Sequence, residues 1–452
     1  MNTKFRNVDN IVSPLGILYI ASLLKQHNIK SIFLDGLLFC SNISDFSRRI
    51  KKHNPDIVGI TSMTSNFDIA KDIAREIKTI NKDIVTVLGG SHVTALPNCI
   101  KDSGFDIGVI GEGEFTFLEL VLALKNKSTI SDIRGIVYKN GNSITINKLR
   151  PLLKEIDILP YPERELLKSV HRYHPAVFNY KHLPCVTILT SRGCNYKCLY
   201  CINSLSNSTF WRGHSVDYVL GEIEKVVVKY SVRNFWILDD DFAFDKGRVY
   251  SICREILKRN LKINWSCMMR VNSADYELLK IMKAAGCWQI AYGIESGSQR
   301  ILDIINKKCY LTQIRQAVNL TKKARIEIKG FFILGLPTET AADIKKTLNL
   351  ATSLPLDYAT FFPLNVIPGT LLEKKADRCG RVIKYPDRMK MPYANNVFIP
   401  NTLSEAELII WQKKAYYRFY FRLGYVLRQI IKLKSFNDLK KKILALGALL
   451  FQ

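Results

Sequence analysis

The sequence predicts an α/β protein with an N-terminal doubly wound, Rossmann-like domain, a partial barrel of six strand-and-helix units, and a helical C-terminal tail. Two observations carry this prediction. Short β-branched runs alternate with helical patterns in two separate stretches of the chain, which is typical of parallel sheets covered by helices. The length of 452 residues also requires more than one core, because domains usually hold about 100 to 200 residues.

The first stretch of alternation predicts a sheet that is buried on both faces. Its apolar runs lack polar interruptions, and a helical pattern covers residues 67–80. The expected strands are residues 31–34, 56–61, 84–88 and 106–110. A hairpin at residues 135–147 and a proline-punctuated linker follow. We therefore place the first domain at residues 1–134 and the hairpin and linker at residues 135–183.

The second stretch of alternation predicts an open barrel. Its expected strands are residues 185–190, 234–238, 264–269, 289–293, 329–334 and 359–366. Because a closed barrel of this kind has eight strands, six strands predict a partial barrel whose chemistry lies at the carboxyl ends of the strands. This core is expected at residues 184–380, and a mostly helical unit at residues 381–452.

The tail at residues 404–434 combines a helical pattern with many aromatic and basic residues. Such a helix suits either the mouth of the barrel or a membrane surface. Packing against the barrel is the favoured interpretation, and peripheral membrane contact stays open. Stacking on single-stranded nucleic acid has no supporting motif.

The composition indicates a folded cytoplasmic protein. Hydrophobic residues make up 47% of the chain, yet no apolar run reaches the roughly 18 to 20 residues of a membrane span, and the first ten residues are polar. Eleven cysteines without a dense framework suit a reducing compartment, where thiols bind metals. The net charge of +26 comes from lysines spread along the chain, so nucleic-acid binding is not expected.

Three cysteines lie on one short loop after an apolar strand. The segment SRGCNYKCLYCIN places Cys194, Cys198 and Cys201 in a Cys-x3-Cys-x2-Cys spacing, so one metal centre can bind all three thiolates. A structural zinc site would need a fourth ligand, and His214 is the only local candidate. A four-iron cluster normally takes four thiolates, so three leave one iron open for chemistry.

This motif resembles that of the radical S-adenosylmethionine superfamily. The resemblance implies a [4Fe-4S] cluster whose open iron binds the amino and carboxylate groups of S-adenosylmethionine. In that family the reduced cluster cleaves the cofactor to a 5′-deoxyadenosyl radical, and the protein supplies position and shielding. A reductant such as flavodoxin or ferredoxin is therefore an expected partner. Tyr200 matches the aromatic residue that the family places against adenine, with core packing as the alternative.

The resemblance assigns further residues to S-adenosylmethionine. Three consecutive aspartates, with Asp240 in the middle, end a buried strand that in the family approaches the amino group, although helix capping also explains one of them. Glu295 and Ser296 match positions near the ribose hydroxyls, with a helix N-terminus as the alternative. Arg270 resembles a position that pairs with the methionine carboxylate, and an ordinary ion pair explains it equally well.

The first domain resembles the cobalamin-binding domain that is fused to many radical enzymes. The resemblance covers residues 12–125 and rests on four short segments, at residues 14–16, 56–62, 89–92 and 111–114. Small residues at Ser62, Gly89 and Gly90 would let the nucleotide tail of cobalamin pass between strands. The Asp-x-His-x-x-Gly motif of the lower axial histidine is missing, and His92 lies elsewhere. The first strand, before residue 14, is expected to be short or lost.

The expected function is methylation, cyclisation or rearrangement at an unactivated carbon. Analogy with tetrapyrrole cyclases and lipid-modifying relatives makes an apolar, lipid-like or tetrapyrrole substrate attractive. Two alternatives stay open. The first is a corrinoid or electron-carrier module with a vestigial barrel, and the second is a radical enzyme whose N-terminal domain no longer binds cobalamin. A methylthiotransferase is not indicated, because its ordered upstream cysteines and downstream basic β-barrel are missing.

Overall fold

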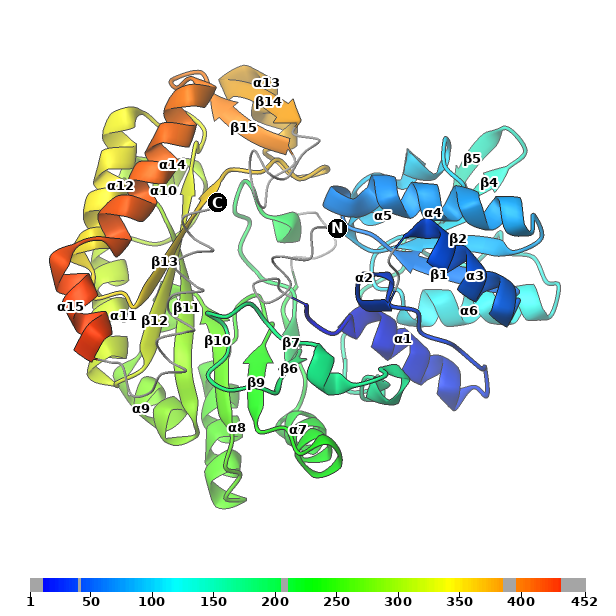
Figure 1. Cartoon of the computed structure of the whole chain (residues 1–452), viewed down its shortest axis with the longest axis horizontal. Helices are drawn as coiled ribbons and strands as arrows, with labels where there is room; N and C mark the ends of the chain where they lie inside the picture. The colour runs from blue at the N-terminus through cyan, green and yellow to red at the C-terminus, as the bar shows by residue number, and fades with distance from the viewer. Residues whose placement is uncertain (1–10, 40–41, 205–209, 385–395, 432–452) are drawn as a thin grey trace. The chain divides into compact units, whose positions relative to one another are not determined.

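The computed structural model of the chain describes residues 11–39, 42–204, 210–384 and 396–431. It divides into two compact units. Residues 14–168 form the first unit, and residues 169 onward form the second together with the stretch that ends at Ser13. Each unit is built on its own sheet (Figure 1).

The first unit holds a five-stranded sheet in the order β1-β2-β3-β4-β5. The strands are β1 (Ile57–Thr61), β2 (Val85–Gly89), β3 (Ile107–Val109), β4 (Ile136–Asn140) and β5 (Ser143–Ile146). The first three strands are parallel, as the sequence predicts. The expected hairpin forms β4 and β5, and β4 pairs antiparallel with β3. The hairpin therefore extends the first sheet, whereas the sequence grouped it with the linker.

Helices cover both faces of this sheet, which makes the unit doubly wound. The helices are α1 (Leu15–Gln26), α2 (Gly36–Phe39), α3 (Ile43–His53), α4 (Phe67–Ile80), α5 (Ser91–Ala95) and α6 (Glu114–Lys125). On β2, Leu88 packs in one hydrophobic cluster with residues of α4 and α5, while its neighbour Val87 packs with Leu120 of α6. Successive strand residues point to opposite faces, so both layers are filled from one strand.

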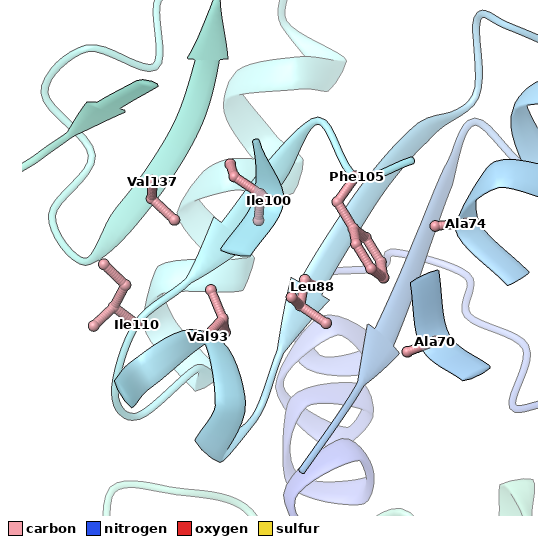
Figure 2. Close-up of a cluster of buried hydrophobic side chains, with 8 residues drawn as sticks. All are labelled: Ala70, Ala74, Leu88, Val93, Ile100, Phe105, Ile110 and Val137. Carbon is pink, nitrogen blue, oxygen red and sulfur yellow. The ribbon is translucent and has the colours of Figure 1, made fainter. Parts of the chain in front are cut away.

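Figure 2 shows the core on the α4 side of the sheet. Its members are Ala70, Ala74, Leu88, Val93, Ile100, Phe105, Ile110 and Val137, and each is at most 6% exposed. Two alanines four residues apart leave α4 with a small contact face. The large Phe105 ring fills the space that they leave. Volume matching of this kind gives the core the packing density of a native protein.

One expected strand of the first unit does not form. Residues 31–34 have no strand pairing, and the Ile32 side chain is 55% exposed. The run therefore does not bury the apolar surface on which the prediction depended. The expected short first strand falls on residues 1–10, which lie outside the described residues, while Ile11 bridges to His174 in the second unit.

The second unit holds a six-stranded parallel sheet in the order β13-β12-β11-β10-β9-β6. Its strands are β6 (Cys185–Ile188), β9 (Asn234–Ile237), β10 (Asn264–Met269), β11 (Cys287–Glu295), β12 (Glu327–Leu334) and β13 (Tyr358–Pro363). These confirm all six expected strands. In the described residues the edge strands β6 and β13 do not pair with each other, so the barrel is open as predicted.

Helices follow the strands along the outside of this sheet (Figure 1). They are α7 (Val216–Tyr230), α8 (Lys246–Lys258), α9 (Tyr276–Ala284), α10 (Gln299–Ile304), α11 (Leu311–Lys323) and α12 (Ala341–Ser353). Four of them begin at side-chain caps that accept a backbone N–H of the first turn, namely Ser215, Asp245, Asp275 and Thr340. Such caps fix where each strand-to-helix loop ends.

The two faces of the second sheet differ in exposure. Along β12 and β13, residues that face the helices are fully buried, as Phe332 stacks on Phe361 and Phe361 contacts Tyr416. The alternate residues Phe331 and Phe362 are only partly buried. The face of the sheet away from the helices is therefore less completely covered at these two residues, and we call it the concave face.

The C-terminal part contains a strand pair as well as helices. Strands β14 (Gly380–Lys384) and β15 (Asn396–Pro400) pair antiparallel, next to the short α13 (Ala376–Cys379). Helices α14 (Glu405–Tyr420) and α15 (Leu423–Ile431) follow. The region is therefore mostly helical, as predicted, and the strand pair is an addition that the sequence did not predict. No helix in the described part of the chain is long and apolar enough to cross a membrane.

Helix α14 packs against the open edge of the barrel, as the favoured interpretation expected. The Tyr420 hydroxyl donates to the Ala359 carbonyl at 2.7 Å and accepts from the Ala359 N–H at 3.1 Å. Tyr416 accepts in the same way from the N–H of Phe361 at 3.3 Å. These hydroxyls occupy the backbone groups that an edge strand leaves unpaired, which protects β13 from pairing with another chain.

We expect Tyr420→Phe to destabilise the second unit. The change leaves a buried N–H and a buried carbonyl of Ala359 without this partner, which costs about 1 to 3 kcal/mol. Denaturant unfolding, monitored by circular dichroism, measures the difference in the free energy of unfolding. Tyr417→Phe is the matched control, because that side chain is 56% exposed on the same helix. Equal stability of both variants would contradict the edge-capping role.

Candidate functional site

The cysteine loop begins at a tight turn after β6. Gly193 has a φ of +82°, a conformation that glycine adopts without strain, and it directs the chain into Cys194. Three backbone contacts hold the loop. Leu199 donates to the carbonyl of Ile305 and accepts from Leu372, both at 3.0 Å, and Asn306 binds the Lys197 carbonyl at 2.8 Å. The loop is therefore fixed from two other segments of the unit.

The three thiols form no disulfide and are largely buried. Cys194 and Cys198 are 9% and 5% exposed, and Cys201 is partly buried. Burial raises the pKa of Cys201 to about 12, and the nearby Cys198 and Cys194 thiols act in the same direction. In the described residues no three ligand side chains are already arranged around an ion position. The Cys201 thiol therefore stays protonated until iron displaces its proton.

Of the three consecutive aspartates, Asp239 is structural. It is fully buried and accepts from the Thr190 N–H at 2.7 Å and from the hydroxyls of Thr190 and Ser191 at 2.6 Å each. Asp240, the residue that the sequence assigned to the cofactor, is exposed. The Asp241 carboxylate accepts the Arg270 N–H at 3.2 Å, and its second oxygen is buried without a partner in the described residues. Burial raises the pKa of Asp241 to about 6.

Arg270 lies directly against the cysteine loop. Its guanidinium stacks 3.6 Å from the centroid of the Tyr196 ring and donates to the Cys198 sulfur at 3.7 Å. It also donates to the Lys307 carbonyl, while Nε has no partner in the described residues. A buried positive charge beside the thiols is electrostatically suited to a cluster with thiolate ligands.

Glu295 reaches the same region through a local irregularity of β11. The register with β12 shifts between Gly293 and Glu295, and Glu295 has a φ of +65°. Such a bulge re-aims a side chain. The Glu295 carboxylate accepts from Lys307 Nζ at 2.6 Å, and both side chains are at most 8% exposed. A Cβ on Gly293 would lie 2.5 Å from Glu295 Oε1, so only glycine fits beside this ion pair.

Tyr200 lies beside Glu295 in the same region as the cysteine loop and Arg270. Burial raises the pKa of its hydroxyl well above the usual range, and the neighbouring Glu295, to which it hydrogen-bonds, raises it further. For Lys307, burial lowers the pKa but Glu295 more than offsets this effect, so the pKa of Lys307 is raised. Lys307 therefore keeps its positive charge, and Tyr200 stays neutral.

The structure thus brings together the cysteines, Tyr200, Arg270 and Glu295, but not Ser296. The Ser296 hydroxyl is fully buried and lies 3.2 Å from Thr347 on α12. His214, the alternative zinc ligand, is also fully buried and stacks on Tyr218 at 3.8 Å. The sequence missed Lys307, because nothing in the spacing distinguishes it from the other lysines of the chain.

Glu339 shapes the turn after β12. It is fully buried, and one carboxylate oxygen accepts the N–H groups of Gly335 at 2.6 Å and Leu336 at 3.1 Å. The other oxygen has no partner in the described residues, and burial raises the pKa to about 8. Glu339 is therefore protonated at neutral pH.

We expect Glu339→Gln to stabilise the protein increasingly as the pH rises. The unfolded carboxyl ionises near 4.5 and the folded one near 8. Between these values the folded state holds more protons, so wild-type stability falls as the pH rises, whereas the amide is not affected. Melting temperatures across this interval measure the effect. A difference between variant and wild type that does not change with pH would contradict it.

The first unit offers a second site at the carboxyl ends of β1 and β2. Gly90 has a φ of +100°, and a Cβ there would lie 2.5 Å from the Ser62 carbonyl, so two loops approach closely. The Ser62 hydroxyl donates to the Met63 carbonyl at 2.9 Å. In contrast, a Cβ on Gly89 would meet only the Ile60 carbonyl, 4.0 Å away. Small residues thus line the ends of these two strands, where the sequence predicts the corrinoid tail.

His92 is not placed as an axial ligand. Its ring lies 4.0 Å from the Phe67 ring, and Nδ1 is 3.2 Å from the Thr64 hydroxyl. The side chain is 6% exposed, and burial lowers its pKa. The neutral imidazole therefore belongs to the packing of the loop, which agrees with the missing axial-histidine motif.

We expect Gly89→Leu to lower corrinoid retention about 10-fold or more while the unit stays folded. The added side chain would occupy the position predicted for the corrinoid tail, and a Cβ there makes only an ordinary contact, 4.0 Å from the Ile60 carbonyl. Corrinoid absorbance after gel filtration measures retention. Gly36→Leu is the control, because that glycine is exposed at the start of α2 with no neighbour within 4 Å. Full retention by Gly89→Leu would place the corrinoid elsewhere.

Comparison with known proteins identifies two domain families in the chain. The B12 binding domain family matches residues 3–121, and the Radical SAM superfamily matches residues 188–351. A protein of Pyrococcus horikoshii named as an uncharacterized methyltransferase is 34% identical over 426 residues, covering 94% of this chain and 91% of that protein. The anaerobic magnesium-protoporphyrin IX monomethyl ester cyclase of Rubrivivax gelatinosus is 27% identical over 91% of this chain and 74% of its own.

Two solved structures have a similar fold. The radical S-adenosylmethionine methyltransferase TsrM from Kitasatospora setae, with cobalamin and a [4Fe-4S] cluster bound, has a TM-score of 0.74 at 16% identity, over 90% of this chain and 89% of that one. The cobalamin-dependent enzyme OxsB with aqua-cobalamin bound has a TM-score of 0.77 at 17% identity, over 97% and 69% of the two chains.

Proposed function

The chain belongs to the radical S-adenosylmethionine enzymes that carry a B12-binding domain, and from that premise we propose that it methylates an unactivated carbon of a small, largely apolar molecule. One observation carries the proposal. Three thiols that form no disulfide lie on one loop beside the buried Arg270 and Glu295, and small residues such as Gly89 line the strand ends of the first unit. The similarity to a named methyltransferase over 94% of the chain supports methyl transfer.

The cofactors are a [4Fe-4S] cluster, S-adenosylmethionine and cobalamin. When bound, the cluster would supply the electron for reductive cleavage of S-adenosylmethionine and so the radical chemistry that the reaction needs. Cys194, Cys198 and Cys201 would hold the cluster. Arg270 places a positive charge beside it, since its guanidinium already contacts the Cys198 sulfur.

The remaining residues of the group would orient S-adenosylmethionine. Glu295 and Tyr200 form a fixed pair of hydrogen-bonding groups suited to ribose hydroxyls and an adenine ring. Asp240 is exposed at the end of β9 and suited to the amino group. The Lys307 ammonium holds Glu295 in place. These groups are fixed before the cofactor binds, which reduces the cost of orienting it.

An acidic electron carrier, a flavodoxin or a ferredoxin, would supply the electron. Exposed lysines surround the anchor points of the cysteine loop: Lys197 and Lys308 lie next to the Asn306 contact, and Lys374 and Lys375 follow Leu372. Opposite charge speeds association and makes it sensitive to salt. Reduction of the cluster by reduced flavodoxin should therefore slow as the ionic strength rises, and charge-reversal variants of these lysines should slow it further.

The test uses the full chain purified without oxygen and reconstituted with iron, sulfide and hydroxocobalamin. We expect a cluster signal, stoichiometric corrinoid absorbance and release of 5′-deoxyadenosine in one preparation. A cluster without deoxyadenosine release would indicate an electron-carrier module instead. Deoxyadenosine without retained corrinoid would reduce the first unit to a scaffold and would exclude cobalamin-dependent methyl transfer.

Cyclisation is the second candidate, and the similarity to the Rubrivivax cyclase over 91% of the chain favours it. The two reactions differ in their use of S-adenosylmethionine. Methyl transfer consumes a second molecule and releases S-adenosylhomocysteine, whereas a cyclisation that moves no methyl group releases none. The product ratio therefore separates the two candidates.

A further inference from the structure

A lysine lies buried on the concave face of the second sheet, near the N-terminal end of β12. Lys329 is 7% exposed and alternates along β12 with Phe331, which is only partly buried, so both side chains leave the strand on the same face. The ammonium donates to the Asn179 side chain at 2.9 Å and lies 5.0 Å from the Phe331 ring centroid and 5.9 Å from that of Phe178. These partners are neutral, and in the described residues no carboxylate forms an ion pair with it.

A second buried hydrogen-bond donor, Gln289, lies on the neighbouring strand β11 close to the register partner of Lys329. Lys329 pairs with Ala291 on β11, and Gln289 precedes Ala291 by two residues, so both point to the concave face. Gln289 is 2% exposed, and its Nε2 has no hydrogen-bond partner in the described residues. Ser266 pairs with Gln289 in register and donates to the Asn179 carbonyl at 3.4 Å. We call Lys329, Gln289, Ser266 and Asn179 the polar floor.

The polar floor carries an electrostatic imbalance. A buried ammonium without a counter-ion is costly, and burial lowers the pKa of Lys329 to about 8. Cation–π contacts with two phenylalanine rings offset only part of that cost. A buried amide donor without a partner adds about 1 to 3 kcal/mol. An anionic ligand that accepts from both donors would remove both penalties at once.

Apolar side chains continue from the polar floor toward the cysteine loop and its neighbours Tyr200, Arg270 and Glu295, which we call the cofactor group. Phe331 and Phe362 contact each other at 5.9 Å between ring centroids, on the same face and nearer the carboxyl ends of the strands. Glu295 lies four residues beyond Ala291, the register partner of Lys329, which corresponds to roughly 13 Å along the strand. The concave face is therefore cationic at one end, aromatic in between, and next to the cofactor group at the other.

We propose that the polar floor binds the anionic end, a carboxylate or a phosphate, of a substrate whose apolar part lies along Phe331 and Phe362 toward the cysteine loop. This inference rests on the proposed function, because it takes the concave face as the substrate site. It makes the substrate amphipathic, with its reacting carbon within roughly 13 Å of the anionic group. Lys329 and Gln289 then act as specificity-determining residues.

The test measures binding to the reconstituted full-length holoenzyme by calorimetry with three probes: 2-naphthoate, 2-naphthyl phosphate and the neutral 2-naphthamide. We expect the wild type to bind one of the anions about 10-fold or more tightly than the amide. The anion that binds more tightly identifies the carboxylate or the phosphate as the natural group. Equal affinities for all three probes would overturn the proposal.

The preference is the ratio of the affinity for the anion to the affinity for the amide. Lys329→Met should reduce this ratio to about 1. Lys345→Met, at an exposed position of α12, should leave it unchanged. Lys329→Met should also melt no lower than the wild type, because it removes an uncompensated buried charge. A lower melting temperature with the preference kept would mean that Lys329 only anchors Asn179, and would overturn the proposal. Gln289→Met provides a second variant and should weaken the preference several-fold.

The outcome is independent of turnover. Release of 5′-deoxyadenosine is measured on the same preparations. If it occurs while the probes bind equally, the proposed function stands and the polar floor has no ligand role. If the anion is preferred but no deoxyadenosine forms, the polar floor stands and the radical chemistry does not.

Discussion

Replacing Cys198 with serine should abolish 5′-deoxyadenosine release by the reconstituted protein. Cys198 is the middle ligand of the loop, its thiol is 5% exposed, and Arg270 contacts its sulfur. A serine hydroxyl ionises far less readily than a thiol, so the cluster would lose one of three protein ligands. We expect an activity loss on the order of 10³-fold or more and less than half of the wild-type iron content. Product chromatography and iron analysis measure the two effects.

The matched control is Cys379→Ser. That thiol is also free, but it is only partly buried on α13, and it donates to the helical carbonyl of Lys375. A hydroxyl makes the same contact, so cluster content and activity should stay unchanged. Full activity of the Cys198 variant, or equal losses in both variants, would contradict the assignment of the cluster loop.

Lys307→Met should cause the second large effect, on both stability and cleavage. The variant leaves Glu295 as a buried charge without its cation, and breaking such a pair costs about 3 to 5 kcal/mol. Release of 5′-deoxyadenosine should fall by about 10² because Glu295 loses its fixed position. Denaturant unfolding and the rate of deoxyadenosine formation measure the two losses.

A double variant separates the structural from the functional share of this pair. Lys307→Met combined with Glu295→Gln removes both charges, so most of the lost stability should return. Cleavage should not return, because the carboxylate itself is missing. Recovery of both properties would mean that the pair has only a structural role. A loss of stability without any loss of cleavage in the single variant would lead to the same conclusion.

The sequence predicts the parts of this protein that local patterns determine. All six strands of the second sheet were predicted from their apolar runs, because each lies between turn and helix signals. The cysteine spacing likewise identifies the cluster loop. The strand predicted at residues 31–34 was wrong. Its three apolar residues resemble a strand, but only tertiary contacts decide whether such a run is buried.

The missed features depend on contacts between distant segments. Lys307 gains its role from Glu295, whose orientation follows from a bulge and a positive φ that the sequence does not reveal. The Ser296 hydroxyl next in the chain contacts Thr347 and does not join the Glu295 carboxylate. The hairpin could be predicted, but its pairing with β3 could not, because alternation does not identify the partner strand.

The central claim, cobalamin-dependent radical methyl transfer, is tested most directly by one product ratio. The reconstituted holoenzyme is incubated with a reductant and S-adenosylmethionine, and S-adenosylhomocysteine and 5′-deoxyadenosine are quantified together. Our account predicts S-adenosylhomocysteine in proportion to the bound corrinoid, together with deoxyadenosine that disappears in the Cys198→Ser variant. Deoxyadenosine without any S-adenosylhomocysteine, in a preparation that retains corrinoid, would contradict it.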